Sequence, residues 1–335
     1  MRDPVATQRH IERSGAGMDF YQALRLLENA HPGQPRIGAS LRPRDDAVRF
    51  GQDPSLGFEP GALAGVTPAA GDTPPRLTVN FTGLLGPNGP LPLHLTEYAR
   101  ERQRNHRDPT LVAFLDVFHH RMVSLFYRAR ASADPATSLD RPESDRFGDY
   151  VGSLFGIGTP ALRGRDEIGD FAKLHFAGLM ANSRRPASGL VAILRAYFKA
   201  PVELEQFVGH WMPIPPDGQS RMGRHDHGNR LGTSTVLGTR VWDRQHKFRL
   251  VIGPLDYAAY RRLLPGGASL RRLVDWVDNY AGLALDWDLR LVLAREEVPR
   301  LALGGKQLGW TTWLASGPAV RDAGDLLINP SAHAG

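Results

Sequence analysis

The side chains best suited to metal binding in this sequence are His225, Asp226 and His227, which follow one another in a polar stretch with several glycines. A zinc site needs three or four ligands and further groups that orient those ligands. Two histidines at positions i and i+2, with no third ligand in support, do not meet that requirement. We therefore interpret them as solvated loop residues and expect no bound metal. A metal-dependent hydrolase that uses His225 and His227 is kept as an alternative hypothesis.

A second pair of histidines, His119 and His120, lies in a segment whose periodicity predicts a long helix. Adjacent residues on an α-helix point about 100° apart, because there are 3.6 residues per turn. The two rings therefore cannot bind one ion together. We expect both to be core or interface histidines.

Two pairs of carboxylates could in principle do acid–base chemistry. Asp286 and Asp288 lie on the polar face of a predicted strand, where solvated charge is normal, and Glu296 and Glu297 precede Pro299 in a predicted turn. The sequence contains no G-x-S-x-G and no H-E-x-x-H motif, and it has no cysteine to serve as a nucleophile. We therefore expect no catalytic residue, no cofactor and no enzyme activity.

The three glycines Gly83, Gly86 and Gly89 form a G-x-x-G-x-x-G pattern that invites comparison with phosphate-binding loops. A Walker loop requires a lysine and a hydroxyl after its last glycine, and a dinucleotide-binding loop opens directly into a helix. Neither feature follows here. The intervening prolines also remove backbone N–H groups that a phosphate would need. The pattern does not favour phosphate binding.

What the prolines do instead is stiffen an extended apolar segment. A preordered segment loses little entropy when a partner docks on it, so it could serve as a hook for another protein. The competing interpretation is an internal connection packed under its own domain. The residues that would make the contact are Leu84, Leu85, Pro87, Pro90, Leu91 and Leu93.

In the first half of the chain, the elements expected to position these residues are helices and short strands. Apolar residues recur every three or four positions at 18–29 and, more strongly, at 108–130, which indicates amphipathic helices. Strands are expected near Val48 and at 76–83, and another helix begins near Thr96, a candidate cap. The longest helix carries an apolar face that must be buried against its own domain or against a partner, namely Leu111, Leu115, Phe118, Met122, Leu125 and Phe126.

The second half of the chain alternates between predicted strands and helices. The clearest strand is 285–294, where every second residue is apolar and the residues between are largely charged. That pattern suits an antiparallel sheet with helices on one face. Tryptophans are confined to this half, where we expect most to fill the core and some to anchor contacts. Further strands are expected at 201–209, 235–243 and 246–253, and helices at 171–181, 189–198, 255–264 and 269–280.

Length and composition favour a protein with more than one core. The chain has 335 residues, which is long for one hydrophobic core and comfortable for two. We expect an α+β fold with a helix-rich N-terminal half and a mainly antiparallel C-terminal sheet. The expected regions are a disordered lead-in at 1–17, a helix and strand region at 18–130, a linker at 131–150, an α+β domain at 151–315 and a flexible tail at 316–335.

Charge and hydropathy limit the classes of partner and the cellular location that we expect for this chain. No apolar run is long enough to span a membrane, and residues 1–17 lack the apolar core of a signal peptide. The absence of cysteine fits a reducing compartment, so we expect the cytoplasm. The net charge is +6, but basic and acidic residues are interspersed and no basic stripe stands out. A nucleic-acid-binding module is therefore only an alternative hypothesis.

Five blocks of the sequence together resemble the TssG (VasB/ImpH) family of type VI secretion baseplate subunits. The blocks occur in the family's order and spacing and cover roughly residues 18–315. They are "LTVNFTGLLGPNGPLPLHLTE", "LVAFLDVFHHRMVSLFYRA", "PVELEQFVGHWMPIP", "NRLGTSTVLGTRVWDRQHKFRLVIGPL" and "LDWDLRLVLAREEVPRLALGGKQLGWTTWL".

This resemblance implies a structural role with no activity and no cofactor. Family members join two copies of the subunit TssF into a wedge, and they contact the adaptor TssK and the subunit TssE. Six wedges surround the spike hub of a contractile injection system, so a hub contact is left open. The implied location is the cytoplasm, at the baseplate docked on the inner membrane, with no membrane insertion and no nucleic acid.

With that role in view, two segments are candidate partner contacts. The first is 83–93, with the residues named above, which would face TssK or TssF. The second is the irregular stretch from Met212 to Thr235, together with Trp211, which precedes it. Its candidate contact residues are Trp211, Met212, Pro213, Ile214 and Pro215.

Overall fold

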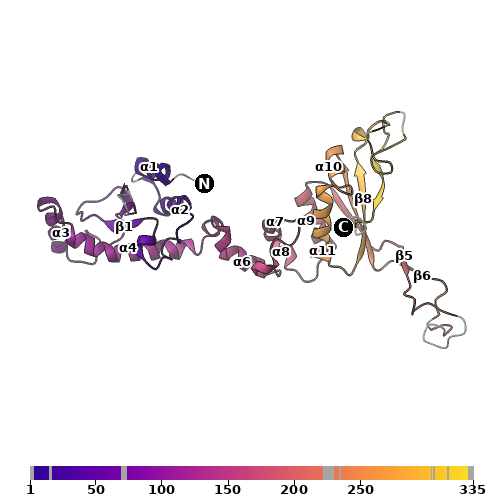
Figure 1. Cartoon of the computed structure of the whole chain (residues 1–335), viewed down its shortest axis with the longest axis horizontal. Coiled ribbons are helices and arrows are strands. Elements are labelled where there is room, and N and C mark those ends of the chain that lie inside the picture. The colour runs from indigo at the N-terminus through magenta and orange to yellow at the C-terminus, as the bar shows by residue number, and fades with distance from the viewer. Residues whose placement is uncertain are drawn as a thin grey trace. The chain divides into compact units, whose positions relative to one another are not determined.

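The chain folds into two compact units in a computed structural model. Unit 1 is Met1–Asp149 and unit 2 is Tyr150–Gly335. The structure describes residues 4–14, 17–68, 74–221, 230–233, 235–302, 304, 306–314 and 317–330. Figure 1 shows the elements of both units along the chain.

Unit 1 is built from helices around a small sheet. Its helices are α1 (Pro4–Ser14), α2 (Phe20–Ala30), α3 (Leu93–Asn105), α4 (Thr110–Ala131), α5 (Pro135–Leu139) and the start of α6 (Arg146–Ser153). Its strands are β1 (Arg49–Gln52), β2 (Leu63–Thr67) and β3 (Arg76–Val79), and 3-10 turns lie at Pro43–Asp45 and Pro142–Ser144.

The sheet of unit 1 has the order β1-β3-β2, with β1 parallel and β2 antiparallel to the central β3. Leu77 and Val79 of β3 are fully buried between the sheet and the helices. They join one core with Phe20, Leu24 and other apolar residues of α2, and with Val123 of α4. A helix capped by Asp19, whose carboxylate accepts a hydrogen bond from the backbone N–H of Gln22, thus supplies much of this core.

The beginning of the chain differs from the disordered lead-in expected at 1–17. Residues 4–14 form α1, which packs on α2. Thr7 and Ile11, four positions apart and so on one helix face, are its buried residues. A stripe of only two residues is too short to stand out in a sequence, which is why periodicity missed it.

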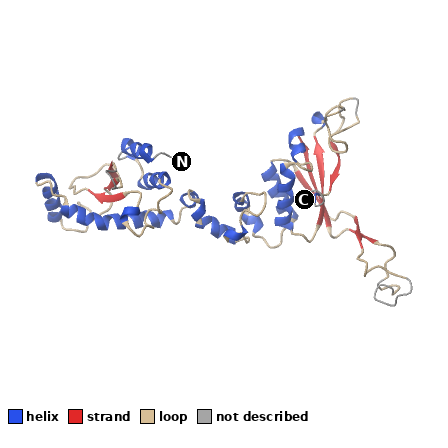
Figure 2. Ribbon diagram, viewed as in Figure 1, coloured by secondary structure: helices blue, strands red, loops and turns tan. Residues whose placement is uncertain are grey.

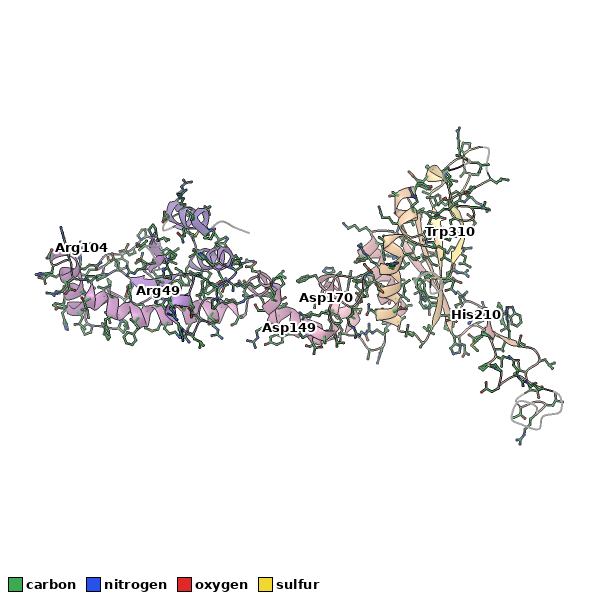
Figure 3. All side chains as sticks on the ribbon, viewed as in Figure 1. Arg49, Arg104, Asp149, Asp170, His210 and Trp310 are labelled. Atoms are coloured by element: carbon green, nitrogen blue, oxygen red, sulfur yellow. The ribbon has the colours of Figure 1, made fainter. Side chains whose placement is uncertain are left out.

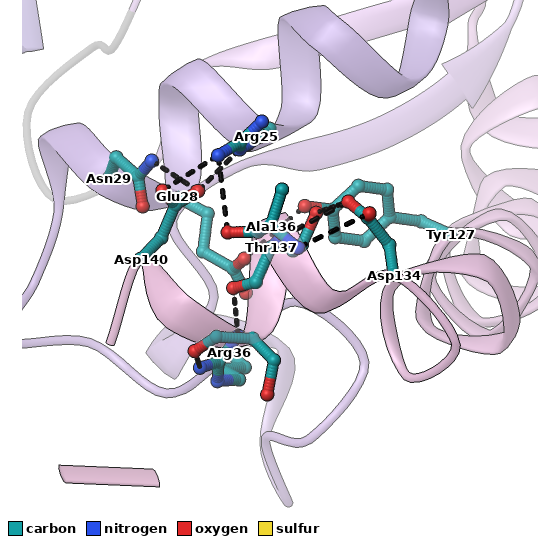
Figure 4. Close-up of polar contacts among 10 residues, drawn as sticks. Arg25, Glu28, Asn29, Arg36, Tyr127, Asp134, Ala136, Thr137 and Asp140 are labelled. Atoms are coloured by element: carbon teal, nitrogen blue, oxygen red, sulfur yellow. Dashed lines mark hydrogen bonds and ion pairs between the residues drawn. The ribbon is translucent and has the colours of Figure 1, made fainter. Parts of the chain in front are cut away.

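The segment expected as a linker, 131–150, also differs from that expectation, because it is held to α2 by hydrogen bonds (Figure 4). The Arg25 guanidinium pairs with the Asp140 carboxylate, which also accepts a hydrogen bond from Asn29 at 2.8 Å. Arg36 donates to the carbonyl oxygen of Thr137 at 3.0 Å. Polar residues that suggested a solvated linker therefore attach this segment to unit 1.

Unit 2 consists of a four-stranded sheet, helices and a separate two-stranded ribbon. Its helices are the end of α6, α7 (Asp170–His175), α8 (Ala177–Met180), α9 (Ala187–Phe198), α10 (Tyr257–Arg262) and α11 (Ala268–Ala281). Its strands are β4 (Val202–Glu205), β5 (His210–Pro213), β6 (Arg240–Asp243), β7 (Lys247–Leu255), β8 (Asp286–Leu293) and β9 (Ala323–Ile328), and 3-10 turns lie at Pro160–Leu162 and Arg295–Glu297.

The four-stranded sheet has the order β4-β7-β8-β9. The outer pairs are antiparallel, whereas β7 and β8 are parallel and are joined through α10 and α11. Figure 2 shows the helices gathered on one face of this sheet. The mixed α+β class expected from the sequence is confirmed. Two of the three strand pairs are antiparallel, as a mainly antiparallel sheet requires.

The core of unit 2 lies between that helical layer and the sheet. Leu289, Leu291 and Leu293 of β8 are fully buried there, and Trp276 of α11 packs in the same cluster. The strand face on which these leucines were placed from alternation is the buried one. The region expected as a flexible tail contributes β9, whose Ile328 closes the edge of the core.

The opposite face of β8 carries one residue that differs from its expectation. Asp288 was expected to be solvated, but it is buried. The Arg249 guanidinium contacts both of its oxygens, at 2.6 and 3.1 Å, and the Lys247 ammonium lies 3.1 Å away. The basic side chains of the neighbouring strand β7 cover the carboxylate, so it serves the sheet rather than catalysis.

Candidate partner-binding surfaces

Helix α4 has two apolar faces, of which unit 1 covers only one. The covered face packs on β1 and contains Val112, Leu115, Val123 and Tyr127. The other face exposes between 42% and 66% of each of its large apolar side chains. We call this second face the α4 stripe, made up of Phe114, Val117, Phe118, Met122, Leu125 and Phe126.

The α4 stripe overlaps the face that periodicity identified, but the described residues of unit 1 do not bury it. Of the six residues expected on the buried face, Leu115 alone is fully buried and Leu111 is half-buried. Leu111, Leu115, Phe118, Met122 and Leu125 follow one another at alternating spacings of four and three. That is the 3.5-residue period of a seam between paired helices. Two of these five residues, Leu111 and Leu115, pack within unit 1, so the stripe keeps only Phe118, Met122 and Leu125 of this pattern.

The covered face of α4 is unusual because it holds the two histidines. The Nδ1 atom of His120 accepts a hydrogen bond from the backbone N–H of Phe50 at 3.3 Å, which leaves Nε2 to donate to Asp46 at 2.9 Å. Burial lowers the pKa of His120, although the hydrogen bond to Asp46 opposes this shift. His120 is therefore a neutral core histidine, as expected from the sequence.

His119 connects α4 to the glycine- and proline-rich segment. Its Nε2 atom accepts a hydrogen bond from the backbone N–H of Leu84 at 2.9 Å, and Nδ1 donates to Asp116 at 3.0 Å. Because both ring nitrogens are used, neither is free to bind a metal. Asp116 in turn accepts a hydrogen bond from the backbone N–H of Gln52 and pairs with Arg76 at 2.6 Å. These contacts hold the Asp116 carboxylate beside the His119 ring.

Two further side chains hold the same segment in place. The amide of Gln52 both accepts from the backbone N–H of Leu85, at 2.9 Å, and donates to its carbonyl oxygen, at 2.7 Å. The Thr96 hydroxyl accepts a hydrogen bond from the backbone N–H of Gly86 at 3.0 Å. Thr96 does not cap α3, because the helix begins three residues earlier, at Leu93. Gly83 is required here, because a Cβ would lie 2.1 Å from the Gln52 side chain. We call His119, Gln52 and Thr96 the loop clamp.

The clamped segment 83–93 is mostly an internal connection. Leu85 is buried with Val112 and Leu115 of α4, and Leu84 and Leu91 pack at the edge of that cluster. Pro87, Pro90 and Leu93 are exposed. The structure thus separates the six candidate residues into an inner group that belongs to the core and an outer group that remains on the surface.

The second candidate segment begins on β5 of the ribbon formed by β5 and β6, which we call the arm. Figure 1 shows β5 and β6 leading away from the sheet of unit 2. Trp211 of β5 pairs in register with Trp242 of β6, and their ring centroids lie 5.3 Å apart in an edge-to-face arrangement. These rings are 59% and 53% exposed. Two large aromatic rings at one spot on an exposed ribbon are typical of a contact surface.

The other candidate residues of this segment surround the tryptophan pair. Pro213 and Pro215 are exposed, whereas Met212 and Ile214 are half-buried. Trp242 was not among the candidates, although the strand expected at 235–243 includes it. His225, Asp226 and His227, together with the hydrolase hypothesis built on them, lie outside the described residues.

Figure 3 shows His210 at the base of the arm. Two carboxylates, of Asp243 and Asp286, lie on either side of its ring. Its Nδ1 atom is 3.9 Å from Asp243 and its Nε2 atom is 3.7 Å from Asp286, so neither contact is a hydrogen bond. Asp243 instead contacts His246 at 3.1 Å. Within the described ranges, no three histidine, cysteine, aspartate or glutamate side chains gather in a geometry that could hold a metal ion.

The described helices are too short or too polar to cross a lipid bilayer. Among the exposed apolar side chains of the described residues, six gather on the α4 stripe in unit 1, and two tryptophans contact each other on the arm in unit 2. Apolar surface of this kind marks sites that bind other macromolecules.

Comparison with known proteins finds one family and two solved structures with a similar fold. A family model described as "Type VI secretion, TssG" matches residues 15–315. One chain of a structure described as the baseplate complex from the type VI secretion system aligns with a TM-score of 0.65 and 26% identity, over 96% of this chain and 92% of that one.

A chain of a second structure, described as the type VI secretion system TssK-TssF-TssG baseplate subcomplex, aligns with a TM-score of 0.54 and 22% identity. That alignment covers 64% of this chain and 90% of the other, and it shows a shared fold. None of the curated proteins compared with this chain matches it.

Proposed function

The chain belongs to the TssG family of type VI secretion proteins, and we propose that it is a structural subunit of the type VI baseplate that joins other subunits without catalysing a reaction. The observation that carries this proposal is the presence of exposed apolar surface in both units. In unit 1 it is the α4 stripe, and in unit 2 it is the tryptophan pair of the arm. One chain with two such surfaces is suited to connect two neighbours.

The partners we propose are TssF and TssK, because a structurally similar chain belongs to a subcomplex described as TssK-TssF-TssG. The sequence resemblance adds two copies of TssF in one wedge, the subunit TssE and a contact with the spike hub. It also suggests a cytoplasmic location, at a baseplate docked on the inner membrane. These assignments remain proposals for this chain.

The α4 stripe suits a helix of a partner. Its apolar residues lie three or four positions apart, from Phe114 to Phe126, so they form one continuous face on which a partner helix can pack. Phe114 and Phe118 contact each other edge-to-face, with ring centroids 5.4 Å apart, and so present one aromatic surface. Burying apolar area contributes about 25 cal/mol per Å², so several large exposed residues can stabilise a complex appreciably.

The arm suits a different kind of contact. Trp211 and Trp242 are half or more exposed on a two-stranded ribbon, and Pro213 and Pro215 stiffen the chain beside them. A stiff ribbon that presents tryptophans loses little entropy on binding, and tryptophan is enriched among the residues that dominate binding energy. The exposed part of 83–93, with Pro87, Pro90 and Leu93, is a smaller third surface.

Co-expression of the chain with its own TssF and TssK tests the proposal. We expect the wild-type chain to co-purify with both. Phe118→Ser on the α4 stripe and Trp211→Ala on the arm should each lose a different partner, because the surfaces lie in different units. Leu41→Ser, which removes an exposed apolar side chain from a different loop of unit 1, is the control for apolar loss and should keep both partners.

Failure of the wild-type chain to recover either protein would contradict the proposed function. Loss of the same partner in both variants would contradict the assignment of separate surfaces. Circular dichroism of each variant separates a lost contact from a lost fold.

A further inference from the structure

A half-open pocket with a mostly apolar lining lies in unit 2 beside the base of the arm. Its volume is about 270 Å³, and it lies between α9, the end of α11 and the connection from β4 to β5. Leu190, Phe248 and Tyr280, which are buried core residues, line its interior. Phe207 and Leu285 line it as exposed residues.

The size of the pocket decides what class of ligand it can take. Pockets for cofactors and drug-sized molecules typically occupy about 300–1,000 Å³ and enclose most of the ligand. This pocket is smaller and half-open, so it suits a side chain or two of another protein rather than a cofactor. A mostly apolar interior further favours a large apolar side chain.

Phe207 gives a reason to treat the pocket as functional. Its φ of 57° places a bulky residue in the left-handed region, which is rare for residues other than glycine and asparagine. Its carbonyl oxygen accepts a hydrogen bond from Nε of Arg244 at 3.3 Å, which helps to hold this conformation. The ring is nevertheless 63% exposed, so it gains little from burial in its own unit. Strained residues of this kind cluster at ligand contacts.

Arg185 supplies a charge at the same pocket. Its guanidinium carbon lies 5.3 Å from the centre of the Tyr280 ring, and Nη1 makes long contacts with the Asn279 carbonyl at 3.5 Å and the Met180 sulfur at 3.7 Å. In the described part of the chain, no carboxylate is within ion-pair distance of it. A guanidinium has five N–H donors in a fork that matches a carboxylate.

Lys247, the other cation of the lining, is already paired with Asp288 at 3.1 Å. Arg185 is therefore the cation of this pocket that is able to take a carboxylate from outside. The pocket also continues into the proposed contact surface of the arm. Phe207 lies three residues before β5 and Gln245 two residues after β6, so a partner that covers the tryptophans passes close to it.

We propose that this pocket binds one large apolar side chain of a baseplate partner, with an aspartate or glutamate of the same partner placed against Arg185. The inference rests on the proposed function, because the occupant is a segment of a partner that also contacts the arm. The pocket would thus determine where along the partner the arm is placed.

The test measures dissociation constants of purified TssF and TssK for the full chain and three variants. Ala281→Phe fills the pocket from the end of α11, Arg185→Glu reverses the charge and Phe207→Gly removes the exposed ring. We expect each to weaken binding of one and the same partner by about tenfold or more, as truncation of a central contact does. Binding of the other partner should not change.

Each variant has a matched control outside the pocket. Ala192→Phe adds a ring to an exposed position of α9, Arg184→Glu reverses an exposed neighbouring charge and Leu283→Gly removes an exposed apolar side chain. All three should bind like wild type. Phe207→Gly also separates binding from folding, because glycine adopts a positive φ without strain. Its melting temperature should stay the same or rise while its affinity falls.

The outcomes of this test separate the proposed function from the assignment of the pocket. If wild type binds neither protein, the proposed function fails and the pocket assignment fails with it. If wild type binds but the pocket variants match their controls, the pocket assignment is overturned while the proposed function stands. Self-association of the wild-type chain that Ala281→Phe abolishes would assign the pocket to a second copy and also overturn it. If Ala281→Phe does not fold, Arg185→Glu and Phe207→Gly test the pocket assignment without it.

Discussion

At the scale of single residues, the best-defined arrangement is the loop clamp of unit 1. His119, Gln52 and Thr96 come from a helix, a strand and a second helix, yet all three bond to consecutive backbone groups from Leu84 to Gly86. A loop rich in glycine and proline has few hydrogen bonds of its own. Side chains must therefore satisfy its buried backbone groups, since an unpaired one costs about 1–3 kcal/mol.

The clamp predicts the effect of replacing His119. In His119→Phe the ring volume is kept, but the backbone N–H of Leu84 loses its acceptor and stays buried. We expect the free energy of unfolding of unit 1 to fall by about 1–3 kcal/mol, measured by urea denaturation. His119→Gln, whose side-chain oxygen can reach the position of Nε2, should recover much of the loss. Equal stability of wild type and His119→Phe would show that the bond contributes little.

His120 predicts a pH dependence. Its pKa is lowered in the folded state, mainly by burial, and Arg49 and Arg121 add to that lowering while Asp46 opposes it. The unfolded chain then binds more protons than the folded one below pH about 6.5, the ordinary pKa of histidine. Stability should therefore be lost as pH falls below about 6.5, by up to about 1.4 kcal/mol per pH unit.

Urea denaturation of the full chain between pH 7 and pH 5, followed by a signal from unit 1, measures this slope. His120→Gln, which can still donate to Asp46, should remove most of it. The carboxylates with lowered pKa values in the same unit, such as Asp140, lose their contribution only as pH falls below about 4 and so do not interfere. A slope unchanged in His120→Gln would assign the effect to another group.

At the scale of elements, α4 shows how a helix can serve two surfaces. Most soluble helices bury one apolar stripe and expose a polar face. Here the covered face includes two histidines and a serine, whereas the α4 stripe is apolar and open. Polar groups on the covered face are tolerated because each is bonded to β1, to the clamped loop or to the helix itself, as Ser124 is through the carbonyl of His120 at 2.6 Å.

We predict that unit 2 does not need the arm for its own stability. The backbone N–H of Val208 bonds to the carbonyl of Lys247 at 2.9 Å, so the two ends of the arm lie side by side on the sheet. Replacing residues 210–244 with two glycines should therefore close β4 and β7 as a simple hairpin. We expect little change in the melting temperature of unit 2 and loss of one baseplate partner.

Thermal unfolding by circular dichroism and co-purification with TssF and TssK measure the two effects. A large drop in melting temperature would mean that the arm supports the sheet. Unchanged recovery of both partners would mean that the arm is not a binding surface.

At the scale of the whole molecule, each of the two compact units has its own main hydrophobic core, and unit 1 also has the smaller cluster around Leu85. Units with separate cores usually unfold as separate transitions. Differential scanning calorimetry of the full chain should therefore show two transitions. At about 0.7 kcal/mol per residue, their enthalpies should be about 100 and about 130 kcal/mol.

Fragments 1–149 and 150–335 provide the control, because each should reproduce one of the two transitions. A single transition in the full chain, with equal calorimetric and van't Hoff enthalpies, would show instead that the units fold as one. That outcome would also contradict the division of the chain into independent domains.

Sequence periodicity by itself determined the regular elements whose apolar pattern is longest, but not α1, α5, α6 or β9. The alternation at 285–294 predicted β8 and its buried face, since a strand with one apolar side must turn it to the core. Apolar residues that recur every three or four positions at 108–130 predicted α4, because that spacing places them on one face of an α-helix. These patterns are local, so a sequence displays them directly, and together they predicted the α+β class.

What the tertiary structure alone decided is which of these surfaces is covered. Periodicity identifies an apolar stripe but not what lies against it, so the exposure of Phe118 and Met122 could not be read from spacing. Leu85 and Leu93 are both leucines of the segment 83–93, yet Leu85, which the clamp holds, is buried, and Leu93 at the start of α3 is on the surface. Arg25 and Asp140 are 115 positions apart, so their pairing, which attaches the expected linker to unit 1, exists only once the chain has folded.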